Sequence, residues 1–145
     1  MSWLRPALGL VALWVSACDP SAAVAGTYSG DLHQNLRQTE PVESAGAEER
    51  TVRQTWVVEL PNAGRLHVTR QGEPSCALDG HVRDTGVFEL SNVQACDFRK
   101  HTLQLAFGDL VPRESRVVVH LVWTWIDVNG DLGSLTESGG LWLQR

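Results

Sequence analysis

The chain has 145 residues, a formal net charge of −5 and 43% hydrophobic residues. This length suits one domain with a hydrophobic core of its own, and the mild acidity argues against a nucleic-acid partner, which would need a basic face. Charged residues make up only 20% and Val, Leu and Trp are frequent, which argues against a disordered chain.

The first predicted element is a secretory signal peptide over residues 1–17. Arg5 precedes an apolar stretch at 6–15, and small residues follow it, an order typical of signal peptides. The stretch is too short to span a membrane, which takes about 20 residues. A buried N-terminal helix is the alternative, but Pro6, Gly9 and the lack of a polar face disfavour it.

The end of this segment, Val15-Ser16-Ala17-Cys18, resembles the lipobox of bacterial lipoproteins: an aliphatic residue, two small residues and a cysteine. In that family the thiol receives a diacylglycerol, the chain is cleaved before the cysteine, and the new amino group receives a fatty acid such as palmitate. The resemblance implies that Cys18 is lipidated and that residues 18–25 form a tether. It also implies that the protein is held on a membrane of the bacterial cell envelope, periplasmic or surface-exposed. Each buried CH₂ of such an anchor contributes about 0.8 kcal/mol.

Lipidation of Cys18 leaves Cys76 and Cys96 as a pair, which resolves the odd number of cysteines. In an oxidising compartment the pair is expected to form a disulfide, which would stabilise the fold by roughly 3 kcal/mol. Two buried free thiols are the alternative. A metal site is disfavoured because there is no CxxC motif and no nearby Cys/His cluster, and we expect no cofactor.

The mature chain is predicted to consist of short strands separated by turns. Alternation supports several of them: Trp56 and Val58 share a face of one strand, and Leu103, Leu105 and Phe107 share a face of another. A polar stretch at 34–50 predicts a long loop, of which 43–50 could form a helical turn. The predicted strands are 25–33, 52–60, 64–71, 75–83, 86–91, 94–98, 102–108, 116–126 and 132–144.

The Asn129-Gly130 pair predicts a hairpin turn between the last two strands. Pairing outward from this turn places Trp123 opposite Thr136. In that register Leu141 falls on the other face of the sheet, unless a bulge at residues 139–140 brings it inward.

Eight or nine short antiparallel strands predict an all-β domain over residues 26–145. We expect a single antiparallel up-and-down β-barrel of about eight strands, and a β-sandwich is the alternative. The segment Gly26-Thr27-Tyr28 resembles the Gly-x-Trp opening of the calycin barrels, which include lipocalins and avidins. In those families the aromatic residue closes one barrel end beneath a basic residue from the last strand. The resemblance implies these roles for Tyr28 and Arg145.

Tryptophans provide the main candidate for a binding site. Of the six in the chain, Trp3 and Trp14 lie in the predicted signal peptide. Trp123 and Trp125 point the same way from one strand. The residues proposed to line a cavity for a small apolar ligand are Trp56, Trp123, Trp125 and Tyr28. The alternative is that these residues fill the core of a small barrel, which eight strands can close around their side chains.

Other groupings give weaker signals. Residues 127–131 resemble the start of a calcium loop, but Leu132 and Ser138 stand where that loop needs Gly and Glu. His67 and His81 could be cross-strand neighbours at a zinc site, although surface histidines are the simpler interpretation. No serine stands in a nucleophile-elbow pattern and no cysteine is left for catalysis, so we predict no catalytic residue, no metal site and no enzyme activity.

Together these patterns predict a lipid-anchored cell-envelope protein with an accessory or interaction role. Its expected partners are the membrane, through the anchor, and another envelope protein. The alternative function is that of a lipocalin-like binder of a small apolar ligand.

Overall fold

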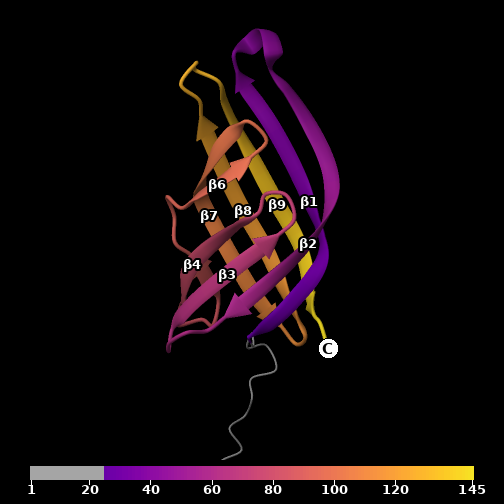
Figure 1. Cartoon of the computed structure of the whole chain (residues 1–145), viewed down its shortest axis with the longest axis vertical. Helices are drawn as coiled ribbons and strands as arrows, with labels where there is room; N and C mark the ends of the chain where they lie inside the picture. Colours follow the sequence, from indigo (N-terminus) through magenta and orange to yellow (C-terminus); the bar gives the residue numbers. More distant parts are fainter. Residues whose placement is uncertain (1–24) are drawn as a thin grey trace, which may run out of the picture.

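A computed structural model describes residues 25–145, which form an antiparallel β-barrel (Figure 1). The predicted signal peptide and Cys18 lie outside these residues. Within the described part of the chain, no helix is long and apolar enough to cross a membrane. The strands are β1 (Gly26–Glu40), β2 (Gly46–Glu59), β3 (Arg65–Gln71), β4 (Cys76–Val82), β5 (Phe88–Leu90), β6 (Ala95–Phe98), β7 (His101–Arg113), β8 (Arg116–Ile126) and β9 (Leu132–Leu143), with a 3₁₀ turn η1 (Val42–Ser44) between β1 and β2.

Hydrogen bonding between neighbouring strands closes the barrel. From β1 to β5 and from β7 to β9 each strand pairs with the next along the chain, while β9 pairs with β1 and β5 with β7. Eight strands therefore form the closed wall, and β6 is an additional strand beside β7. The predicted up-and-down barrel is confirmed, and the alternative of a β-sandwich is wrong.

The strands differ in length, and this gives the barrel two different ends. We call the end where residue 25 and the C-terminus lie the lower end, and the opposite end the upper end (Figure 1). The β1–β2 hairpin and the β8–β9 turn extend beyond β3 and β4 at the upper end. Strand β2 pairs with β3 only from Thr55 to Glu59, so the first half of β2 has no strand neighbour on that side.

Apolar side chains fill the interior along the alternate positions of each strand. The fully buried residues include Leu32, Trp56, Val68, Leu78, Leu103, Leu121, Trp123, Leu135 and Leu141. Each methylene removed from water contributes about 0.8 kcal/mol, so this shared interior is the main source of stability. The barrel is therefore packed with side chains over its closed section.

The predicted loop at 34–50 is wrong except in its middle. Strand β1 continues to Glu40 and β2 begins at Gly46, and the two pair down to Gln38 opposite Gly46. The segment is polar for a physical reason: among its inward positions on β1, Leu36 packs against the apolar core, while Gln34 and Gln38 are polar. Gln34 belongs to a buried polar network, and the residues beyond it line a cavity at the upper end.

The predicted register of the last hairpin is wrong by one residue. Trp123 lies opposite Leu135, because the loop has three residues between Asp127 and Asp131, and Asp127 N donates to Asp131 O at 2.8 Å. Gly130 takes the left-handed conformation that this longer loop needs, at φ 88°. The β8–β9 pairing then runs without a shift, so Leu141 points inward without a bulge at residues 139–140.

Phe107 does not share the buried face of Leu103 and Leu105. The β7–β8 register shifts between Leu105 and Phe107, and this bulge turns Phe107 outward, where it is 42% exposed. Gly108 takes the next inward position, where a side chain would meet Leu121.

The predicted disulfide between Cys76 and Cys96 is confirmed, with their Cα atoms 5.6 Å apart. It joins β4, in the barrel wall, to the additional strand β6. The bridge therefore links β6 to β4, whose backbone pairing with β5 covers only Gly80–Val82.

Candidate functional site

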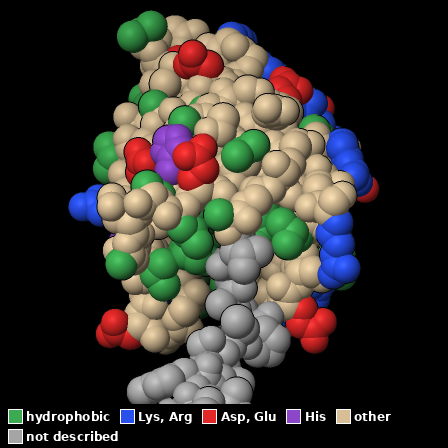
Figure 2. Space-filling view, turned by 60° about the horizontal axis from the view of Figure 1, so that its bottom comes forward, with side chains coloured by type: hydrophobic (Ala, Val, Ile, Leu, Met, Phe, Trp, Pro, Cys, Tyr) green, Lys and Arg blue, Asp and Glu red, His purple; other side chains and the backbone are tan. Residues whose placement is uncertain are grey.

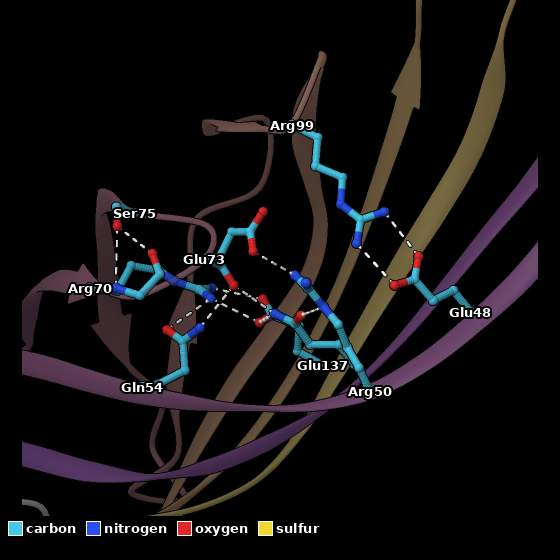
Figure 3. Close-up of polar contacts among 10 residues, drawn as sticks. Glu48, Arg50, Gln54, Arg70, Glu73, Ser75, Arg99 and Glu137 are labelled. Carbon is cyan, nitrogen blue, oxygen red and sulfur yellow. Dashed lines mark hydrogen bonds and ion pairs between the residues drawn. The ribbon is translucent and has the colours of Figure 1, made fainter.

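A buried ion pair crosses the barrel interior. The side chains of Arg70 on β3 and Glu137 on β9 are fully buried. Two parallel hydrogen bonds join them, from Nη1 to Oε1 and from Nη2 to Oε2, each 2.8 Å long (Figure 3). This two-point geometry is the strongest form of an arginine–carboxylate contact.

Two further donors converge on the Glu137 carboxylate. Gln34 Nε2 donates to Oε2 at 2.9 Å, and Trp123 Nε1 donates to Oε1 at 2.8 Å. Burial alone would raise the pKa of Glu137, but the charge of Arg70 and these hydrogen bonds outweigh it and lower the pKa below its ordinary value of 4.5. The carboxylate is therefore kept ionised inside the barrel.

Gln54 completes this network on the side of β2. Its Oε1 accepts from Arg70 Nη2 at 3.3 Å and from Trp56 Nε1 at 3.1 Å, while its Nε2 donates to the carbonyl of Glu73 at 2.9 Å. The Arg70 guanidinium also lies 5.0 Å from the Trp56 ring. These polar side chains hold one another in place. We call the group formed by Gln34, Gln54, Arg70 and Glu137 the polar plug.

The four aromatic residues predicted to line a ligand cavity do not lie around one space. Trp56 and Trp123 are fully buried, and their indole N–H groups are engaged by Gln54 and Glu137. Tyr28 is buried near the lower end, and Arg145 is exposed at the C-terminus, so packing of one over the other stays a prediction. Trp125 does line a cavity.

That cavity has a volume of about 500 Å³ and lies at the upper end of the barrel. We call it the mouth pocket. It lies between the β1–β2 hairpin, the β6–β7 turn and β8. Its lining residues are Leu36, Gln38, Gly46, Ala47, Glu48, Arg99, Lys100, His101 and Trp125.

Trp125 is held in the mouth pocket from two sides. The ring of His101 stacks on the indole with a centroid separation of 4.4 Å, and His101 Nδ1 lies 2.8 Å from Asp127 Oδ2. Gly133 leaves the space that the indole fills, since a Cβ there would lie 1.9 Å from Trp125 Cζ2. Trp125 Nε1 is buried and has no hydrogen-bond partner among the described residues. Leaving such a donor unsatisfied costs about 1–3 kcal/mol.

Side chains replace backbone pairing in the wall of the mouth pocket. Arg99, in the β6–β7 turn, reaches across to Glu48 on β2 and forms two hydrogen bonds of 2.9 and 3.0 Å (Figure 3). The hydrogen bond from Arg99 lowers the pKa of Glu48, and the same bond raises the pKa of Arg99. Phe98 lies between two guanidinium groups, at 5.4 Å from Arg50 and 5.2 Å from Arg99. These contacts bridge the gap left where β3 and β4 end.

Lys100 is the single lysine of the chain and is exposed at the rim of the mouth pocket. Within residues 25–145 it forms no ion pair, whereas the neighbouring Arg99 is bound to Glu48. Lys100 therefore supplies a free positive charge to the same lining that contains Trp125. An ammonium group and an N–H donor in one lining suit a ligand that carries negative charge.

The other groupings singled out in the sequence have ordinary surroundings. Residues 127–131 form the β8–β9 turn. His67 Nδ1 lies 2.7 Å from Asp79, and His81 Nε2 lies 3.7 Å from Glu89. In the described part of the chain, no three metal-ligating side chains come together.

Sequence reasoning missed the buried polar plug and Lys100. The alternation that identified the core also places the polar residues inward: Arg70 is two residues after Val68, and Gln54 is two before Trp56. The alternation of inward and outward positions along each strand therefore already contained this signal. Lys100 had no such signal, because only the folded barrel brings the β6–β7 turn against the β1–β2 hairpin.

Comparisons with known proteins do not assign a function to this chain. No protein-family model, no curated protein and no solved structure matches this chain. The function is therefore argued from geometry and charge.

Proposed function

We propose that this protein is a lipid-anchored binding protein of the bacterial cell envelope, which holds a small molecule in the mouth pocket. One observation carries this proposal: the β1–β2 hairpin, which lines the mouth pocket, and the start of the barrel lie at opposite ends (Figure 1). A tether that ends at residue 25 would join the lower end to the membrane. The pocket would then open away from the membrane, into the aqueous compartment.

The length of β1 gives the scale of this arrangement. Ten residues of strand separate Gly26, at the lower end, from Leu36, which lines the mouth pocket. At roughly 3.3 Å per residue this is about 33 Å of strand. Figure 2, which brings the lower end forward, shows hydrophobic side chains gathered there. A ligand could therefore reach the mouth pocket without meeting the membrane surface.

The mouth pocket has the size and lining of a small-molecule site. Such sites measure roughly 300–1,000 Å³ and combine apolar walls with a few polar groups. Here Leu36 and Trp125 supply apolar surface, and Gln38 and Lys100 supply polar groups. The barrel interior below it is packed, which favours binding at the upper end over the deep apolar cavity of a lipocalin-like binder.

The anchor is tested by changing Cys18 to Ala. We expect the wild-type chain to sediment with membranes and to incorporate labelled palmitate. Cys18→Ala should lose the label and leave the membrane fraction. Ser21→Ala, a change in the predicted tether that leaves the lipobox intact, should behave as the wild type. If Cys18→Ala stays in the membrane fraction with its label, the anchor is not at this residue and the proposal fails.

A further inference from the structure

We infer that the mouth pocket binds a small amphipathic anion, with its charged oxygens at Lys100 and Trp125 Nε1 and its apolar body against Leu36. This inference rests on the proposed function, because it names the ligand class of the same pocket. It differs from an apolar ligand, for which neither polar group would have a use.

The charges around the mouth pocket favour an anion. Its lining contains two cations, Arg99 and Lys100, and a single carboxylate, Glu48. Both oxygens of Glu48 are engaged by Arg99, so that pair is neutral toward a ligand. The charge left over is that of Lys100, whose ammonium rotates freely and adapts to a bound oxygen.

The unpaired indole of Trp125 calls for an acceptor. An indole N–H can only donate, and buried donors in native structures nearly always have a partner. The other two inward indoles follow this rule, since Trp56 and Trp123 donate to Gln54 and Glu137. A ligand oxygen would give Trp125 the partner that it lacks among residues 25–145. A carboxylate or sulfonate oxygen satisfies this donor and Lys100 together.

A second hollow beside Lys100 is unsuited to the same ligand. Its volume is about 460 Å³, and its lining includes Asp127 and Asp131. The Asp131 carboxylate would repel an anion there, whereas at the mouth pocket Glu48 is paired with Arg99 and Asp127 is held by His101. The charge distribution therefore directs an anion toward Trp125.

The test compares two probes of the same shape, 2-naphthoate and its neutral amide, 2-naphthamide. Both are titrated calorimetrically into the full chain in neutral detergent, with detergent blanks subtracted. We expect one site that binds naphthoate at least about tenfold more tightly than naphthamide, the size of one charge-assisted hydrogen bond. Gly46→Trp should abolish binding of both, because Gly46 lines the mouth pocket and a Cβ there meets no atom within 4 Å. Ala77→Trp, on the exposed surface of β4, is the matched control.

Charge and donor are then removed one at a time. Lys100→Gln should weaken naphthoate about tenfold and leave naphthamide unchanged, whereas Arg65→Gln, an equal loss of charge on β3, should change neither. Trp125→Phe should weaken naphthoate, because the N–H donor is gone. Trp142→Phe, on a half-exposed tryptophan, is its control.

Each outcome decides between the two proposals. If naphthamide binds as tightly as naphthoate and Lys100→Gln has no effect, the mouth pocket is still a binding site, but the inference that it prefers an anion is overturned. If neither probe binds, or if both bind equally to Gly46→Trp, the mouth pocket is not the binding site and the proposed binding function is overturned as well.

Discussion

Arg70 and Glu137 are the residues on which the interior of this barrel depends most. Each is a charge removed from water, and each is compensated chiefly by the other. Removing one partner of such a pair costs about 3–5 kcal/mol, while replacing both with apolar side chains is often neutral. The pair therefore specifies how the strands pack without necessarily adding net stability.

We predict that Glu137→Gln lowers the free energy of unfolding at pH 7 by about 3 kcal/mol or more, because it leaves Arg70 buried and uncompensated. The double variant Arg70→Met with Glu137→Leu should recover most of the loss. Urea denaturation followed by circular dichroism measures both. A double variant as unstable as the single one would show that the two residues do not act as a pair.

The same pair sets the response to acid. The folded pKa of Glu137 lies below its ordinary value of 4.5, so its contribution to stability is complete above that pH. As the pH falls through the folded pKa, Glu137 becomes protonated and this contribution is lost. In the double variant this part of the acid sensitivity should be absent.

At the scale of elements, the β8–β9 hairpin positions the tryptophan of the mouth pocket. Trp125 and Gly133 are paired in register, and the absent side chain of Gly133 is what makes room for the indole. The three-residue loop sets this register, and a two-residue turn would have placed Trp125 opposite Ser134 instead.

We predict that Gly133→Ala displaces Trp125, because the new Cβ would overlap the indole. Overpacking of this kind costs about 1–3 kcal/mol and should also weaken 2-naphthoate binding. Gly140→Ala on the same strand should leave stability and 2-naphthoate binding unchanged, because the nearest atom to a Cβ there, Arg116 Nη1, is 3.7 Å away. Equal behaviour of the two variants in denaturation and titration would contradict this account of Trp125.

Most of the barrel could be predicted from local patterns, because alternation and turn residues are short-range signals. The strands around Trp56, Val68 and Leu78 were identified with the correct faces. The extension of β1 and β2 could not be predicted, because its inward residues face a polar plug and an open pocket. The one-residue error at Asn129-Gly130 arose because such a pair suits both two- and three-residue loops.

The candidate site was harder to predict than the fold. Of the four aromatic residues proposed, the sequence could not separate Trp125 from Trp123, which points to the same side two residues earlier. What separates them is the partner across the sheet: Trp123 reaches Glu137, while Trp125 finds no acceptor. That difference depends on contacts between strands distant in the chain.

At the scale of the whole molecule, the described part of the chain is a packed cylinder that is hollow at its upper end. The closed section is filled, and the mouth pocket begins where β3 and β4 end and side chains such as Glu48 and Arg99 take over the wall. The lower end carries both the start of β1 and the C-terminus. The hollow at the upper end therefore follows from unequal strand lengths.

The most direct test of this account follows the indole N–H signals by NMR. Four tryptophans follow the predicted cleavage site, and single Trp→Phe variants assign their signals in the full chain. On addition of 2-naphthoate, we predict that the Trp125 signal shifts to lower field as its N–H gains an acceptor. The signals of Trp56 and Trp123, held by Gln54 and Glu137, should stay in place. Shifts of Trp56 and Trp123 with Trp125 unmoved would place the ligand inside the barrel and contradict the account.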